Sequence, residues 1–506
     1  MPIFSDSLPA VGRRRAQGIR SAWPSGAPGY ALLGLLLAGV ALRLIAILSW
    51  WPATALDDSY ERFADSNPFA NPLHPAGYPL ILGALGAMTR ELALTIFVQH
   101  LSGIVSALLL WGATRRLTGS AWAGLLPAGI VLLDPDLIFL EHSIMAESWA
   151  VLATSIGLYA AVRAFDEPEP WWRWPLLTGA VLALGVTIRT AGLLMIPVVV
   201  LALLVSRPRS SRSWWEYLRG PTAAAGAAAV VLLAFAAANG IFGERFGIRS
   251  SPGWYLYGRV AQFADCSRFT PPDGTEVLCE QTPSAARPGA SWYWGQGFRA
   301  GSGSPALRYF GPFGEHDDLL GQWSKRAILA QPLDYLSSVW QYLHAYWFPG
   351  APPDRPDSGT GLDPQLAFAD GYSAVSLAVI EASTQRNLET FYNDFTVDQD
   401  RPGLEFLRDW QQVIRFGPIA LSITTALTLI GLAIGTRRSR VGVLLFGIGG
   451  LALIVAPALT ANYVGRYTVP MAGPLMAAAA ITIVELWRGQ VRRTRLAEGD
   501  ARDLTP

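Results

Sequence analysis

The chain has 506 residues, of which 51% are apolar and 15% are charged, and its formal net charge is +1. Soluble domains carry about 25% charged residues, so this composition excludes an ordinary soluble protein. A net charge near zero gives no reason to expect nucleic acid as a partner. Stretches of about 20 apolar residues recur, each long enough to cross about 30 Å of hydrocarbon. The sequence therefore predicts an all-α polytopic membrane protein.

Arginine clusters set the number and direction of the predicted spans. The ten expected spans are 31–50, 95–114, 121–140, 145–164, 175–188, 191–206, 222–242, 416–435, 441–460 and 468–487. With this count, every arginine cluster falls on one side of the membrane, which the positive-inside rule makes the cytoplasm. Merging the short fifth and sixth spans would put later clusters outside. Both termini are therefore expected in the cytoplasm.

The same topology divides the chain into segments. They are a cytoplasmic arm (1–30), a membrane core (31–242) with its first external loop at 51–94, an extracytoplasmic domain (243–415), C-terminal membrane helices (416–487) and a cytoplasmic tail (488–506). The extracytoplasmic domain is expected to be of mixed, helix-rich structure. Its stretch "SPGWYLYGRVAQFADC" predicts an ordered aromatic loop. Its stretch "GQWSKRAILAQPLDYLSSVWQYLHAYWF" predicts amphipathic helices on the membrane or against the bundle.

Both cysteines, Cys266 and Cys279, fall in the segment expected outside the cytoplasm. Disulfides persist in that compartment, and the chain has no third cysteine. We therefore predict that these two cysteines pair.

The first external loop contains two adjacent carboxylates, Asp57 and Asp58, followed by the stiff phrase "HPAGYP" with His74 and Tyr78. A carboxylate beside an apolar surface can act as a general base on a hydroxyl. It can also hold a divalent cation through its oxygens. The alternative is a solvated pair at a helix end. His74 is either a ligand or base, or a hydrogen-bonded loop residue.

Other charged residues lie at the ends of predicted spans. Glu147 enters the fourth span, and intramembrane acids usually face a cavity or a partner. Arg189 and Arg466 lie at external turns, away from the cytoplasmic clusters, where the planar guanidinium fork suits a phosphate. Pairing with Glu147 or Asp58 is the alternative. Arg43 lies deeper inside the first span, and we expect it in an internal structural pair.

In their order and common side, these motifs resemble the GT-C fold glycosyltransferases. That group includes protein O-mannosyltransferases, the aminoarabinose transferases of lipid A and mycobacterial arabinofuranosyltransferases. The matching stretches are "LDDSYERFA", "HPAGYPL", "SIMAES", "TIRTAGLLMIP" and "GRYTVP". The resemblance implies a GT-C-like helical bundle in the cell membrane. It also implies an inverting transfer of a sugar from a polyprenyl-phosphate donor to a hydroxyl of a glycan, lipid or protein acceptor, on the extracytoplasmic side.

The resemblance also implies roles for single residues. Asp57 or Asp58 would be the general base, and Arg189 and Arg466 would bind the donor phosphate. The remaining candidates for substrate binding are Glu147, His74, Tyr78 and Tyr467. Some relatives depend on a divalent cation and others do not, so the cofactor is left open.

The alternative function is a transporter or flippase of lipid-linked saccharides. Such a protein would place its substrate groups near the membrane midplane and often shows paired repeats. Here the polar groups gather at the outer surface, and no repeat stands out. The sequence therefore favours the enzyme.

Overall fold

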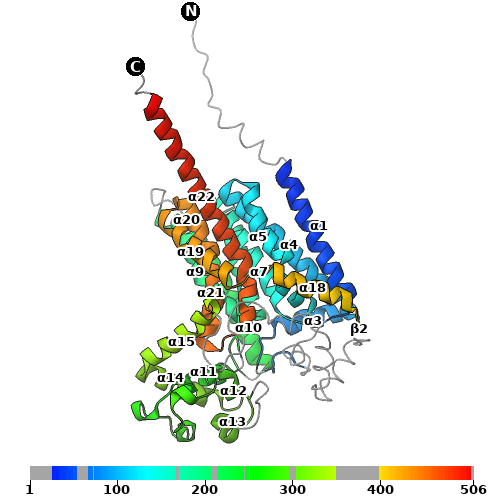
Figure 1. Ribbon diagram of the computed structural model, residues 1–506. Coiled ribbons are helices and arrows are strands. Elements are labelled where there is room, and N and C mark those ends of the chain that lie inside the picture. The colour runs from blue at the N-terminus through cyan, green and yellow to red at the C-terminus, as the bar shows by residue number, and fades with distance from the viewer. Residues whose placement is uncertain are drawn as a thin grey trace, which may run out of the picture.

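The computed structural model describes residues 26–53, 67–71, 73–166, 170–206, 213–243, 245–249, 251–295, 304–348 and 398–502. Asp57 and Asp58 lie outside the described residues. The described helices form a bundle with a smaller helical lobe at one end (Figure 1). The start of α1 (Ala27–Ser49) and the end of α22 (Val469–Arg502) lie at the other end of the bundle.

Six helices of the described residues are long and apolar enough to cross a membrane. Four of them are single helices: α1, α4 (Leu92–Thr118), α7 (Glu147–Asp166) and α10 (Trp214–Phe242). The fifth, Arg437–Thr460, is made of α20 (Arg437–Val443), a π-helical turn (Leu444–Ile448) and α21 (Gly449–Thr460). The sixth, Gly465–Val491, is made of η6 (Gly465–Thr468) and the first part of α22. The described chain is therefore a multi-pass helical membrane protein.

Two bent helix pairs raise this number to eight if each pair is one span. The first is α5 (Ala121–Leu133) with α6 (Pro135–His142), bent by 50°. The second is α18 (Arg401–Val413) with α19 (Pro418–Ile434), bent by 41°. In both pairs a proline opens the second helix, because proline tolerates the first helical turn but interrupts a continuing one.

The predicted count of ten spans is not confirmed. The fifth and sixth predicted spans are helical, as α8 (Arg173–Ile188) and as η1 (Thr190–Leu194) followed by α9 (Met195–Ser206). Each is short, however: the 16 residues of α8 rise only about 24 Å. A further short apolar helix, α3 (Gly77–Gly86), lies near the lobe.

Arginine-rich helix ends meet at the end of the bundle opposite the lobe. Arg438 on α20 donates to the Arg116 carbonyl oxygen (2.8 Å) and to the Asp166 carboxylate (2.7 Å). Arg488 on α22 donates to the Thr118 carbonyl oxygen (2.5 Å). The basic ends of α4, α20 and α22 therefore lie on one side, as the charge pattern predicts. Which side faces the cytoplasm stays a prediction.

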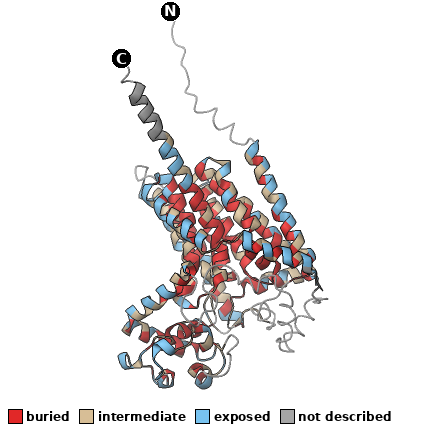
Figure 2. Ribbon diagram, viewed as in Figure 1, coloured by how far each residue is buried: buried red, intermediate tan, exposed pale blue. Residues whose placement is uncertain are grey.

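Buried polar groups join α1 to α4 and α6 inside the bundle. Arg43 Nη2 lies 2.8 Å from Glu141 Oε1, and His100 Nδ1 lies 3.0 Å from Glu141 Oε2. His142 Nε2 lies 2.5 Å from the Trp50 carbonyl oxygen. The expectation of an internal pair for Arg43 is confirmed, and this network fixes the C-terminal end of α1. Figure 2 shows that the buried residues concentrate in the middle of the bundle and in the lobe.

A two-stranded ribbon begins where α1 ends. β1 (Trp50–Trp51) pairs antiparallel with β2 (Asp398–Gln399), in the register Trp50 to Gln399. The Asp400 amide also donates to the Ser49 carbonyl oxygen (2.8 Å). The chain that enters the twin-aspartate loop is thus tied to the chain that enters α18.

The lobe has its own aromatic core around α11. Its helices are α11 (Pro252–Ala261), η2 (Cys266–Arg268), η3 (Glu276–Leu278), η4 (Ser284–Ala286), α12 (Ala290–Tyr293), α13 (Pro305–Phe310), α14 (Asp317–Ala330) and α15 (Pro332–Trp347). The prediction of an aromatic loop for "SPGWYLYGRVAQFADC" is therefore wrong in part, because α11 begins at Pro252 in this stretch. The predicted amphipathic stretch is α14 and α15.

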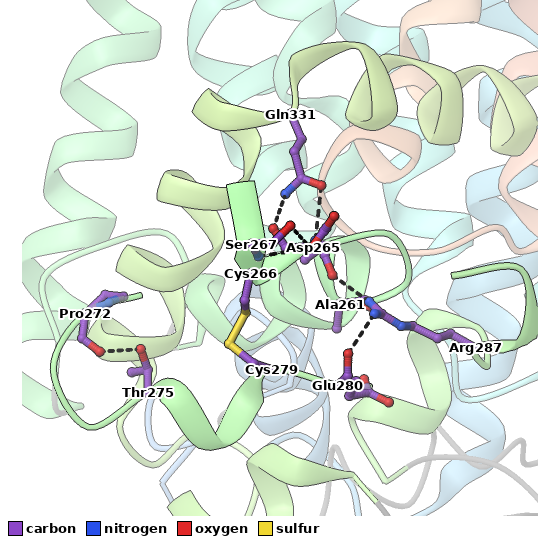
Figure 3. Close-up of a disulfide and its surroundings, with 11 residues drawn as sticks. Ala261, Asp265, Cys266, Ser267, Pro272, Thr275, Cys279, Glu280, Arg287 and Gln331 are labelled. Atoms are coloured by element: carbon purple, nitrogen blue, oxygen red, sulfur yellow. Dashed lines mark hydrogen bonds between the residues drawn. A yellow bond between two sulfur atoms is a disulfide. The ribbon is translucent and has the colours of Figure 1, made fainter. Parts of the chain in front are cut away.

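Cys266 and Cys279 form a disulfide in the lobe, with their Cα atoms 5.8 Å apart (Figure 3). Gln331 accepts from the Asp265 amide (3.1 Å), which ties the loop to the start of α15. Arg287 donates to the carbonyl oxygens of Ala261, the last residue of α11 (2.9 Å), and of Ala264 (2.7 Å). The crosslink therefore stands among hydrogen bonds that hold the irregular part of the lobe to its helices.

Candidate functional site

A cavity of about 600 Å³ opens between the bundle and the lobe. The bundle contributes the turn between α8 and η1 and the chain from the end of α21 through η6. The lobe side contributes residues 245–249 and the starts of α11 and α14. The charged and aromatic residues that line it are His74, Arg189, Arg245, Phe246, Arg249, Tyr255, Trp294, Asp317, Asp318, Arg466 and Tyr467. Four of the predicted site residues, His74, Arg189, Arg466 and Tyr467, thus line one cavity although they come from three separate parts of the sequence.

On the bundle side, one carboxylate lies between two guanidinium groups. Glu147 begins α7 and is fully buried. Arg189 contacts its Oε1 atom, and Arg466 Nε lies 3.4 Å from the same oxygen. The pairing with Glu147 that the sequence offered as an alternative is therefore present. Both guanidinium groups therefore approach the same carboxylate oxygen at the edge of the cavity, and guanidinium groups are suited to binding anions such as phosphate.

Local backbone geometry places these arginines at the cavity. Arg189 is the extended residue between α8 and η1, with φ −147° and ψ 112°. Its guanidinium carbon lies 4.6 Å from the ring centre of Tyr467, a cation–π contact that orients the side chain. Arg466 and Tyr467 both lie in the short helix η6. Only 14% of the Arg189 side chain and 18% of the Arg466 side chain are exposed, so their electrostatic effect on a ligand is weakly screened.

The "HPAGYPL" phrase lies beside this group. The Asn71 side chain accepts from the His74 amide (2.8 Å), which closes a turn, and His74 lines the cavity. A β-carbon on Gly77 would lie 2.4 Å from the Thr187 carbonyl oxygen, so glycine permits α3 to approach the end of α8 directly before Arg189. Tyr78 is fully buried and donates to Gln99 (2.8 Å), and it does not line the cavity.

The lobe side of the cavity carries its own charges. Arg245 donates to Asp317 (2.8 Å) and to Asp318 (3.3 Å). Burial raises the pKa of Asp317, although hydrogen bonds from the Trp254 and Gly253 amides and the charge of Arg245 act in the opposite direction. The guanidinium carbon of Arg249 lies 3.9 Å from the ring centre of Tyr255.

The two candidate bases, Asp57 and Asp58, lie outside the described residues, so their side chains are not placed. The described chain before them ends at Ala53, which belongs to one buried cluster with Ala146 and Ile188, the neighbours of Glu147 and Arg189. Within the described ranges, no group of three or more His, Cys, Asp or Glu side chains could hold a metal ion.

Sequence reasoning missed the lobe side of the site. Arg245, Arg249, Tyr255 and Trp294 lie in a segment that carries no recognisable motif. The signal available was the aromatic content of "SPGWYLYGR" and the two arginines, Arg245 and Arg249, that precede it. Nothing in the spacing of these residues predicts that they turn toward the α8–η1 junction.

The comparisons with known proteins support the class of protein that this fold and site define. Residues 90–243 match the family model described as dolichyl-phosphate-mannose-protein mannosyltransferase. This segment includes Glu147 and Arg189, and the match confirms the predicted resemblance to GT-C fold glycosyltransferases over that part of the chain. No curated protein matches the sequence.

Solved structures of an archaeal enzyme are also similar. The apo oligosaccharyltransferase of Archaeoglobus fulgidus is 12% identical in sequence. The alignment covers 94% of this chain and 52% of the oligosaccharyltransferase chain, with a TM-score of 0.44. The oligosaccharyltransferase AglB of Archaeoglobus fulgidus, in complex with an inhibitory peptide and a dolichol-phosphate, is 12% identical, covers 93% of this chain and 51% of its own, and gives a TM-score of 0.39. The chain spans about half the length of these proteins.

Proposed function

We propose that this protein is a membrane glycosyltransferase that moves a sugar from a polyprenyl-phosphate donor to an acceptor hydroxyl on the side of the membrane that carries the lobe. The observation that supports it most is the convergence of Arg189 and Arg466 on Glu147 at the bundle side of the cavity. A lipid phosphate at the membrane surface would meet these guanidinium groups. The match to a dolichyl-phosphate-mannose-dependent family over residues 90–243 supports the same donor class.

The reaction we propose is a single displacement. The acceptor oxygen forms a bond to the anomeric carbon of the sugar while the bond from that carbon to the phosphate oxygen breaks. The configuration inverts, the phosphate leaves with the bonding electron pair, and Asp57 or Asp58 takes the proton of the acceptor hydroxyl. Arg189 and Arg466 stabilise the charge on the departing phosphate. A divalent cation held by the aspartates is a second way to stabilise it.

The chain length permits this assignment. Asp57 and Asp58 follow Ala53 by four and five residues in the sequence. Five residues of chain span at most about 18 Å, so either carboxylate stays within that reach of the cluster behind Glu147 and Arg189. The sugar and the acceptor are not identified by these observations.

The test measures sugar transfer by the full-length protein in liposomes, with radiolabelled polyprenyl-phosphate sugars. Loss of a general base lowers the rate by about 10²- to 10⁴-fold, so either Asp57→Asn or Asp58→Asn should do so. Asp273→Asn, at an exposed site in the lobe, is the matched control and should transfer at the wild-type rate. If both loop variants are folded and transfer normally, neither aspartate is the base.

The same experiment separates the enzyme from the transporter. Transfer releases one polyprenyl phosphate for each sugar moved, whereas a flippase moves the intact lipid-linked sugar between leaflets. Movement of intact donor without released polyprenyl phosphate would favour the transporter.

A further inference from the structure

The arginines that line the cavity differ in their partners. Arg189 and Arg466 face Glu147, and Arg245 faces Asp317 and Asp318. The fourth is Arg249, and no carboxylate among the described residues pairs with it. Its Nε–H group is buried and donates to no acceptor in the described part of the chain.

The flat face of the Arg249 guanidinium packs on the ring of Tyr255, with its central carbon 3.9 Å from the ring centre. The Tyr255 hydroxyl donates to the Leu73 carbonyl oxygen (2.8 Å), and the Tyr255 ring meets Trp294 edge-on at 5.0 Å. A cation–π contact uses the flat face of a guanidinium and leaves its N–H groups, which point outward in the plane, available as donors. The fork is therefore oriented before a ligand arrives, which suits a planar carboxylate or a phosphate.

The nearby carboxylates do not cancel this charge. Asp317 accepts from the Trp254 amide (2.8 Å) and from Arg245, and its side chain is nearly inaccessible. Asp318 also faces Arg245, and 86% of its side chain is exposed, so solvent screens it. Both acids thus share the charge of Arg245, and the lobe side of the cavity retains the positive charge of Arg249.

We propose that Arg249 binds an acidic group, a carboxylate or a phosphate, of the acceptor. This inference rests on the proposed function, because it assigns the acceptor side of the same cavity. The donor phosphate belongs to a membrane lipid and meets Arg189 and Arg466 at the ends of membrane helices. Arg249 instead stacks on Tyr255, which lies on α11 of the lobe. The acceptor class is therefore an acidic saccharide or another soluble anionic hydroxyl compound.

The test is a binding experiment that needs no sugar transfer. Full-length protein in nanodiscs is saturated with polyprenyl monophosphate, which occupies the donor arginines. Tryptophan fluorescence then follows titration with glucuronate, glucose 6-phosphate or neutral glucose at constant ionic strength. Hydrogen bonds to a charged group predict that at least one acidic sugar binds about ten- to a hundredfold more tightly than glucose. Arg249→Gln should abolish that preference, and Arg249→Lys should recover part of it.

The controls separate this site from the donor site and from net charge. Arg326→Gln removes the same charge outside the cavity lining, where Arg326 donates to the Thr270 carbonyl oxygen, and it should keep the preference. Arg249→Gln should bind polyprenyl monophosphate like the wild type, whereas Arg189→Gln should bind it less tightly. The proposal is overturned if wild type shows no acidic preference, if Arg249→Gln keeps it, or if Arg249→Gln loses polyprenyl monophosphate as Arg189→Gln does. Absence of sugar transfer, by contrast, would count only against the glycosyltransferase.

Discussion

Arg466 Nε lies 3.4 Å from Glu147 Oε1, the carboxylate oxygen that Arg189 also contacts. Glu147→Gln keeps the shape of this side chain and removes its charge. We expect polyprenyl monophosphate to bind at least as tightly, because the cavity becomes more positive. Sugar transfer should fall about tenfold or more, because the two arginines lose the group that orients them. Equilibrium binding and single-turnover transfer test the two effects, and weaker phosphate binding would contradict the electrostatic reasoning.

The contact between α3 and α8 predicts a difference between two glycines of one helix. Gly77→Ala would put a β-carbon against the Thr187 backbone, and overpacking of this kind costs about 1–3 kcal/mol. Gly83→Ala is the matched control, because a β-carbon there meets no atom within 4 Å. Thermal unfolding in detergent should show a lower midpoint for the first variant only. Equal midpoints would mean that α3 can move away from α8 without cost.

Asp317 makes the stability of the lobe depend on pH. Burial raises the pKa of its carboxyl above the ordinary value of 3.8, so the folded lobe holds a proton that the unfolded chain releases. Stability from this group should therefore fall as pH rises from that value through the folded-state pKa. As the pH rises from about 4, the midpoint of wild type relative to Asp317→Asn should decrease. An increase would show that the pairing with Arg245 outweighs burial.

The topology is open to direct labelling. Ala70 is exposed four residues before His74, which lines the cavity, and Trp215 is exposed at the start of α10. In intact cells, Ala70→Cys should react with an impermeant thiol reagent, and Trp215→Cys should react only after the membrane is opened. The native cysteines are joined in the disulfide and leave a low background. The reverse pattern would place the cavity in the cytoplasm and remove the basis of the proposed reaction.

The sequence predicted what depends on composition and local chemistry. Apolar length and arginine position were enough for the helical membrane bundle, and the resemblance pointed to Arg189, Arg466 and Glu147, which meet in the structure. The span count was harder to predict, because α8 is helical and apolar but short, and hydropathy does not say how such a helix sits in a membrane. Tyr78 was named from its motif, yet it is a buried partner of Gln99.

The lobe side of the cavity could not be predicted for a different physical reason. The position of Arg249 depends on the stacking of Tyr255, which in turn depends on a hydrogen bond to Leu73, 182 residues earlier in the chain. Long-range packing of this kind leaves no periodic or spacing signal in one sequence. The place of such residues in the cavity can be recognised only from the three-dimensional structure.

The lobe supplies one wall of the cavity and carries the Cys266–Cys279 disulfide, so the extracytoplasmic placement that we propose for the lobe would link completion of the site to export. A copy whose thiols are still reduced would keep its membrane helices and its bundle-side arginines, while Tyr255 and Arg249 would rest on a less constrained scaffold. The disulfide would then form only after the lobe has crossed the membrane. The lobe wall of the cavity would reach its final structure only in the compartment where we expect the acceptors.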